Sequence, residues 1–334
     1  MNTPTLMVKV AGLLGHPLPI STHPAAFDDS GSIHLPADIR EQAARPSRVR
    51  AKNNIRFARA VRPDGRERPL RLDLLMPEAP GRHPLVVYIP GGGFVRAAKA
   101  GGRRMRRYIA AAGYVVASIE YRTTLDGATY RDGMSDVWAA VGHLTAHADE
   151  YGVDPQRIAL WGESAGGYLA AMVGVTARSE RGEEGNAILA VIDKFGGSAL
   201  DRLAEGFDEA TIAAVYAPGN SIARYVNGPE ARLITDDPDA LRAADPAAQV
   251  TPDAPAFLLF HGSDDRIISP VQTGLLHHAL RAADVPSAWY IVDGAGHGDL
   301  AVKGGEEKYW TTEPMLRLLA DFLDRETRQP VTDR

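Results

Sequence analysis

Short apolar runs alternate with amphipathic segments over most of the chain. Continuous apolar runs predict buried strands, because a strand covered on both faces has no polar side. Segments whose apolar residues recur every three or four positions predict helices between them. Strands are expected at 85–89, 114–119, 157–161, 188–195, 256–260 and 289–292, and helices at 103–112, 134–144, 165–175, 271–283 and 315–322. This alternation predicts an α/β fold, with a mainly parallel sheet covered by helices on both faces.

Three segments depart from this rhythm. Residues 55–61 and 70–75 read as strands on either side of Pro63-Asp64-Gly65, which predicts a hairpin. Residues 199–250 show no clear strand and are polar and proline-rich, as is typical of an insertion. We therefore expect one domain, with a catalytic core at 55–198 and 251–334, a cap at 199–250 and an irregular or partly helical N-terminal arm at 1–54 that joins the cap.

Composition narrows the function classes. The 334 residues are 45% hydrophobic, enough for a full core. A net charge of -5 argues against a nucleic-acid-binding surface, and the absence of cysteine excludes disulfides and thiol catalysis. No apolar run is long enough to span a membrane, and no secretory signal is evident, so we expect a cytoplasmic protein.

A glycine-flanked serine stands directly after one predicted strand. Gly162-Glu163-Ser164-Ala165-Gly166 lies between the strand at 157–161 and the helix at 165–175. This order predicts a nucleophile elbow, a turn so tight that its flanking positions require glycine. The elbow lifts the serine hydroxyl above the sheet and directs free N–H groups of the helix toward developing negative charge. Ser164 is the candidate nucleophile.

A nucleophilic serine requires a base, and the base requires an orienting acid. Elbow folds carry them in the order serine, acid, histidine. Asp265, which we prefer to Asp264, follows the strand at 256–260, and His297 lies in a glycine-rich loop after the last strand. Both positions are beyond the carboxyl ends of strands, where open parallel sheets form their sites. We therefore predict Asp265 as the orienting acid and His297 as the base.

Three glycines, Gly91-Gly92-Gly93, follow the first buried strand. Glycines allow backbone N–H groups to approach a ligand closely, as an oxyanion hole requires. Gly92 and Gly93, with the N–H of Ala165, are the predicted donors. A dinucleotide-binding fingerprint would need glycine at position 96, which is arginine, and no Gly-Lys-Ser/Thr follows for a phosphate-binding loop.

Together these motifs resemble the α/β-hydrolases of the esterase/lipase group, in the branch of hormone-sensitive-lipase-like and feruloyl-esterase-like enzymes. The likeness spans roughly residues 55–325 and rests on the triple glycine, Glu120-Tyr121-Arg122, Asp136, Gly162 to Gly167, His261-Gly262-x-x-Asp265 and Gly296-His297. It implies the same roles for Ser164, Asp265, His297 and the oxyanion donors. One departure is Pro90, which stands where the family usually has a histidine that helps to hold the oxyanion loop.

The expected reaction is hydrolysis of a small carboxylic ester through an acyl-enzyme, with no metal or organic cofactor. Phe94, Tyr216 and Tyr225 are the candidate pocket residues, and we expect a monomer or homodimer. Interception of the acyl-enzyme by an alcohol or amine, as in a transferase, cyclase or amidase, is the alternative among enzymes. The alternative of another class is a ligand-binding protein on a hydrolase scaffold, which would have no need of a complete serine, aspartate and histidine set.

Overall fold

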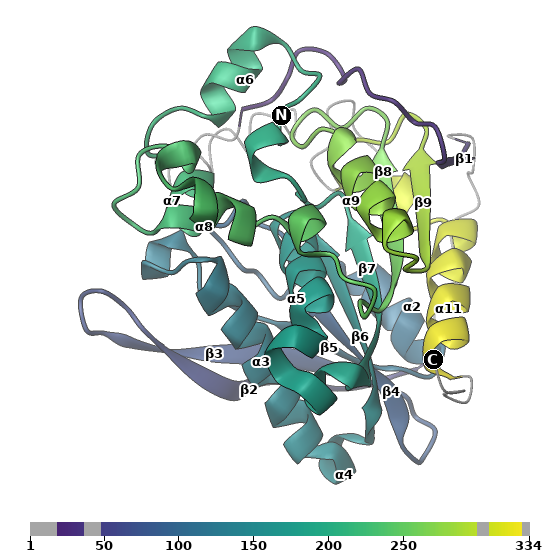
Figure 1. Ribbon diagram of the computed structural model, residues 1–334. Coiled ribbons are helices and arrows are strands. Elements are labelled where there is room, and N and C mark those ends of the chain that lie inside the picture. The colour runs from purple at the N-terminus through teal and green to yellow at the C-terminus, as the bar shows by residue number, and fades with distance from the viewer. Residues whose placement is uncertain (1–18, 37–47, 299–306, 329–334) are drawn as a thin grey trace, which may run out of the picture.

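A single mixed sheet forms the centre of the molecule (Figure 1). The computed structural model describes residues 19–36, 48–298 and 307–328, and over these ranges nine strands follow the order β1-β9-β8-β7-β6-β4-β5-β3-β2. The strands are β1 (Ile33–Leu35), β2 (Arg50–Val61), β3 (Glu67–Met76), β4 (His83–Ile89), β5 (Val115–Ile119), β6 (Val153–Glu163), β7 (Ile188–Lys194), β8 (Ala256–Gly262) and β9 (Ser287–Val292). Only the pairs β2–β3 and β3–β5 are antiparallel, which confirms the predicted mainly parallel sheet.

Helices cover both faces of this sheet, as predicted. They are α2 (Arg103–Ala111), α3 (Tyr130–Ala146), α4 (Ala148–Tyr151), α5 (Ala165–Arg181), α9 (Val271–Ala282), α10 (Glu307–Trp310) and α11 (Glu313–Thr327), with short 3-10 turns η1 (Thr124–Asp126) and η2 (Gly182–Ala187). Alternate residues of a strand point to opposite faces. In β6, Ile158 and Leu160 join a core with α3, α5 and α9, whereas Ala159 and Trp161 join a second core with α2 and α11. None of the helices in the described ranges is long and apolar enough to cross a membrane.

The N-terminal arm differs from the prediction in two respects. β2 begins at Arg50, so residues 50–54 of the predicted arm are already strand. Ile33–Leu35 is a strand that pairs in parallel with Tyr290–Val292 and so extends the sheet by β1. The pattern missed it because three residues are too few to show a periodicity. Residues 1–18 and 37–47 of the predicted arm lie outside the described residues.

Residues 19–32 are the described stretch of the arm before β1, and they contact two parts of the chain. The backbone N–H of Ser21 donates to the carbonyl of Arg266 at 2.8 Å, and its hydroxyl bonds the Asp208 carboxylate at 3.0 Å. Ala26 donates to the carbonyl of Gly206 at 3.1 Å. This stretch therefore joins the loop after β8 to the segment at 199–250.

Residues 199–250 form short helices at one end of the sheet (Figure 1). These are η3 (Leu200–Arg202), α6 (Glu209–Val215), α7 (Ser221–Asn227), η4 (Ile234–Asp236), α8 (Pro238–Ala243) and η5 (Pro246–Gln249). Side chains of Asp208, Asn220 and Asp237 accept backbone N–H bonds at the first turns of α6, α7 and α8. Such capping lets helices this short form without a core of their own.

Candidate active site

Ser164 occupies the turn between β6 and α5, with φ 55° and ψ -124°. Residues other than glycine rarely adopt this backbone conformation. The turn is also tight, which explains the glycines on either side of the serine. A Cβ on Gly162 would collide with the carbonyl of Gly166, and one on Gly166 would collide with the carbonyl of Ile89. The sequence thus builds a turn that only glycine permits, and it places the serine at the N-terminus of α5.

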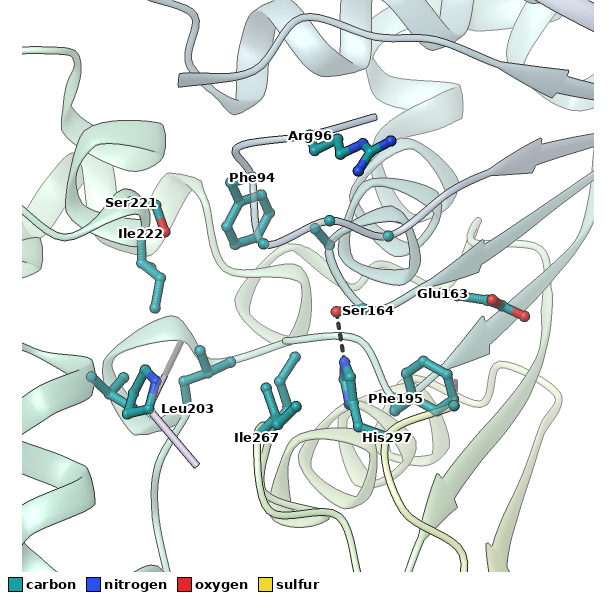
Figure 2. A pocket seen from close by; sticks show the side chains of 18 of the residues that line it. Phe94, Arg96, Glu163, Ser164, Phe195, Leu203, Ser221, Ile222, Ile267 and His297 are labelled. Atoms are coloured by element: carbon teal, nitrogen blue, oxygen red, sulfur yellow. Dashed lines mark hydrogen bonds between the residues drawn. The ribbon is translucent and has the colours of Figure 1, made fainter. Parts of the chain in front are cut away.

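The structure brings the three predicted catalytic side chains together. His297 Nε2 lies 2.8 Å from Ser164 Oγ (Figure 2). On the other edge of the imidazole, His297 Nδ1 lies 2.7 Å from Asp265 Oδ2. The other carboxylate oxygen of Asp265 accepts the backbone N–H groups of Ile267 and Ile268 at 2.9 and 3.0 Å. The neighbouring Asp264 instead pairs with Arg266 at 2.9 Å. The geometry therefore favours Asp265 as the acid.

The environment keeps the Asp265 carboxyl ionised. Its side chain is fully buried, and burial alone would raise its pKa. The charge of His297 and the hydrogen bonds from His261 and His297 outweigh burial and hold the pKa of Asp265 well below its ordinary value. An ionised Asp265 can fix the orientation of His297 and stabilise its protonated form.

The glycine loop after β4 lies against the elbow. Ile89 pairs with Gly162 across β4 and β6, and a Cβ built on Gly91 would lie 3.0 Å from the Cβ of Ser164. Gly92 and Gly93 both have positive φ, at 151° and 61°, which brings their backbone close to the serine without a side chain intervening. Gly92, Gly93 and Ala165 all line the cavity beside Ser164.

Pro90 is held in a way that the sequence did not indicate. The hydroxyl of Tyr121, a fully buried residue, donates to the carbonyl of Pro90 at 2.9 Å. Tyr121 belongs to the Glu120-Tyr121-Arg122 segment that follows β5, the strand next to β4. This bond anchors the start of the glycine loop.

A cavity of about 540 Å³ opens beside the serine. The segment at 199–250 contributes to its wall through Val215 of α6 and Ile222 of α7. Figure 2 shows Ser164 between two sides of this cavity, with Phe94, Leu203, Ile222 and Ile267 on one side and Glu163 and Phe195 on the other. The side of the nucleophile lined by these four apolar residues can therefore receive an apolar group.

Two of the three predicted pocket residues are not among the described residues that line the cavity. Phe94 lines it, whereas Tyr225 stacks behind Phe94 with ring centroids 4.6 Å apart. The Tyr216 hydroxyl accepts the backbone N–H of Ala204 at 3.3 Å. Tyr225 thus supports the wall through Phe94, and direct contact of Tyr216 and Tyr225 with a substrate stays a prediction.

A buried ion pair beside the nucleophile escaped the sequence analysis. Lys194 Nζ lies 2.8 Å from Glu163 Oε1, and the Tyr88 hydroxyl donates to Glu163 Oε2 at 2.8 Å. Lys194 is 1% exposed and its ammonium lies 4.6 Å from the ring centre of Trp310. The sequence feature that could have revealed this pair is a lysine at the end of an otherwise apolar strand, β7. The pair neutralises the carboxylate nearest in sequence to Ser164.

No group of three or more His, Asp or Glu side chains within the described ranges is arranged to hold a metal ion. The chemistry open to the described side chains at this site is proton transfer and nucleophilic attack by the serine.

Sequence comparisons relate the chain to a family model and to proteins named as esterases. The family model described as BD-FAE matches residues 72–280. The chain is 31% identical over 265 residues to esterase LipC of Mycobacterium tuberculosis, covering 75% of this chain and 60% of the relative. It is 26% identical over 284 residues to a probable isoprenylcysteine alpha-carbonyl methylesterase ICME of Oryza sativa, covering 79% of this chain and 65% of the relative. The chain thus spans less than two thirds of the length of these curated relatives.

Solved structures share the fold at lower identity. A truncated carbohydrate esterase from gut microbiota superposes with a TM-score of 0.65 at 22% identity, covering 88% of this chain and 99% of the other. Esterase 2 of Thermogutta terrifontis superposes with a TM-score of 0.63 at 23% identity, covering 85% and 95%. The likeness confirms the predicted α/β-hydrolase fold.

Proposed function

Because the chain belongs to the BD-FAE family, we propose that it is a serine hydrolase that cleaves small carboxylic esters through an acyl-enzyme. The observation that carries this proposal is the continuous hydrogen-bonded series Ser164–His297–Asp265, which opens onto a cavity large enough for a small ester. A protein that only binds a ligand has no need of such a series. The named relatives LipC and ICME are an esterase and a probable methylesterase, which supports the same reaction type.

The geometry supports a two-step reaction. His297 Nε2 removes the proton from Ser164 Oγ as the oxygen attacks the ester carbonyl carbon, and the carbonyl electron pair moves onto its oxygen. The backbone N–H groups of Gly92, Gly93 and Ala165 stabilise this oxyanion. The tetrahedral intermediate collapses, the alcohol leaves with the proton held by His297, and Ser164 carries the acyl group.

The second step repeats the first with water as the nucleophile. His297 removes a proton from water, which attacks the acyl carbonyl, and then returns the proton to Ser164 Oγ as the acid is released. Asp265 remains ionised throughout and stabilises the imidazolium formed in each step. The reaction consumes one ester and one water and yields one alcohol and one acid.

Substrate selection is assigned to the cap. Residues 199–250 supply Leu203, Val215 and Ile222 to the cavity wall, and Phe94 and Ile267 of the core extend this apolar surface. An apolar side of this kind favours esters with an aliphatic or aryl group on that side of the serine.

Monomeric or homodimeric state and cytoplasmic location remain predictions, which size-exclusion chromatography and cell fractionation would test.

The test combines a panel of p-nitrophenyl esters of increasing acyl length with labelling by a fluorophosphonate. The wild-type protein should hydrolyse part of the panel and incorporate the label. S164A should lose labelling and lower kcat by several orders of magnitude, up to about 10⁶-fold, while remaining folded. S179A, in the same helix with its hydroxyl bonded to the Thr176 carbonyl, is the matched control and should behave as wild type. Full turnover by pure S164A would contradict the acyl-enzyme.

A further inference from the structure

A second histidine contacts the orienting acid. His261 is in β8, four residues before Asp265, and its side chain is fully buried. Its Nε2 lies 3.2 Å from Asp265 Oδ2 and 3.0 Å from the carbonyl oxygen of Ile268. The same Oδ2 is 2.7 Å from His297 Nδ1. One carboxylate oxygen therefore faces two imidazoles.

The contacts of His261 determine where its proton is. A backbone carbonyl can only accept a hydrogen bond, so Nε2 of His261 carries the hydrogen and is shared between Ile268 and Asp265. On the opposite edge, Nδ1 lies 3.2 Å from the Thr273 hydroxyl, which itself accepts the Trp289 indole N–H at 3.0 Å. The Thr273 hydroxyl also lies 3.2 Å from the Pro270 carbonyl, to which it donates, so the firmly held nitrogen of the imidazole is Nε2, whose N–H is directed toward Ile268 and the acid.

These hydrogen bonds form a closed network around the Asp265 carboxylate. The Ile268 N–H donates to Asp265 Oδ1, while the Ile268 carbonyl accepts from His261. Ile268 is therefore tied through its N–H to the carboxylate and through its carbonyl to His261. Ile267 and Ile268 of this loop also line the cavity. Loss of the His261 N–H would leave a buried carbonyl unpaired and Asp265 Oδ2 with one imidazole donor in place of two.

We propose that His261 is a positioning residue for the reaction proposed above, on which this inference rests: its Nε2–H holds the Asp265 carboxylate in the orientation that pairs with His297. Its second effect is electrostatic. The hydrogen bond from His261 draws negative charge away from Oδ2, and without it the carboxylate would attract the His297 proton more strongly.

This role differs from packing in what it predicts. Asp265 and His297 are the titratable groups that join His261 in this cluster, and Asp264 beside them pairs with Arg266. Among the described residues, the imidazole also contacts Thr273 of α9, Phe195 after β7 and the carbonyl of Ile268, none of which titrates in the working range. A phenylalanine would refill the space of the imidazole without supplying a donor. A glutamine would place an amide N–H near the position of Nε2.

The test compares H261F and H261Q in the full-length protein, with H277F as the matched control. His277 is a buried histidine of α9 whose Nδ1 lies 2.9 Å from the Ser287 hydroxyl, away from the site. Melting temperature, kcat, KM, the rate of fluorophosphonate labelling and the pH profile of kcat/KM are measured for each. We expect H261F to lower kcat between about 10- and 100-fold with little change in KM, as misplacement of a catalytic group does.

The pH profile separates positioning from stability. In H261F the acid limb of kcat/KM should move to higher pH, because His297 gives up its proton less readily. H261Q should recover most of kcat and the wild-type limb, and H277F should lose stability without moving the limb. An H261F protein that is folded and keeps the wild-type limb and kcat, or an H261Q protein as impaired as H261F, overturns the inference. A wild-type protein that neither labels nor hydrolyses any ester overturns the proposed function instead.

Discussion

Replacing Ser164 by glycine should yield a more stable protein than replacing it by alanine, although both changes remove the nucleophile. The backbone at this residue has φ 55° and ψ -124°, a region that costs a residue with a Cβ about 1–3 kcal/mol. Both variants lose the hydrogen bond to His297, so their difference isolates the Cβ. Glycine also has more conformational entropy in the unfolded chain, which lowers the free energy of unfolding by about 0.4–1 kcal/mol and offsets part of the gain from the relieved strain.

The net advantage of S164G over S164A is therefore about 0.5–2 kcal/mol. For a chain of 334 residues this corresponds to about 1–3 °C in melting temperature, because the unfolding entropy scales with length. Urea unfolding followed by tryptophan fluorescence, with calorimetry in parallel, would measure it. The pair S179G and S179A, in the regular helix α5, is the control and should show the opposite order. Equal or lower stability of S164G would refute the assignment of strain to the elbow.

Three further outcomes are expected. Burial raises the pKa of the Asp193 carboxyl to about 7, above its value in the unfolded chain, so the stability that the protonated carboxyl contributes is lost as pH rises through 7. D193N, which cannot ionise at this position, should therefore be more stable than the wild-type protein in urea titrations at pH 8. D265N should lower kcat by about 10⁴-fold in ester assays and should also lower the melting temperature, because the depressed pKa of Asp265 means that its ionised form stabilises the fold. Because His297 acts as a base only when neutral, kcat/KM should rise with pH through one ionisation, and a flat profile with rate-limiting chemistry would contradict this.

The parts of the fold that could be predicted are those with a local signature. Buried strands are continuous apolar runs, and the runs at 85–89 and 256–260 both lie within strands of the structure. Ser164 could be selected because the elbow is encoded within five residues. Asp265 and His297 could be selected because the order of strands restricts where side chains can meet above the serine, and the structure places His297 beside Ser164 and Asp265 beside His297.

The remaining features depend on contacts between distant segments. β1 is too short to show a pattern and exists because β9 offers it a free edge. Tyr225 looks like a pocket residue in sequence, but which side of Phe94 it occupies is decided by how α7 packs on the core. The pairing of Lys194 with Glu163 joins residues 31 positions apart, and nothing within either segment specifies the other.

The cavity wall at Phe94 is backed by a second layer of side chains, and this layer affects how such a protein can change its substrate range. Phe94 forms part of the wall with a positive φ of 62°, and it is held between the stacked ring of Tyr225 and the edge of Tyr168. The Tyr168 hydroxyl in turn donates to the carbonyl of Ala244, beyond α8. A substitution at either tyrosine reshapes the wall without touching the bound molecule. Natural drift in specificity therefore has routes through the supporting layer, and a mutant library confined to cavity-lining codons would leave those routes unsampled.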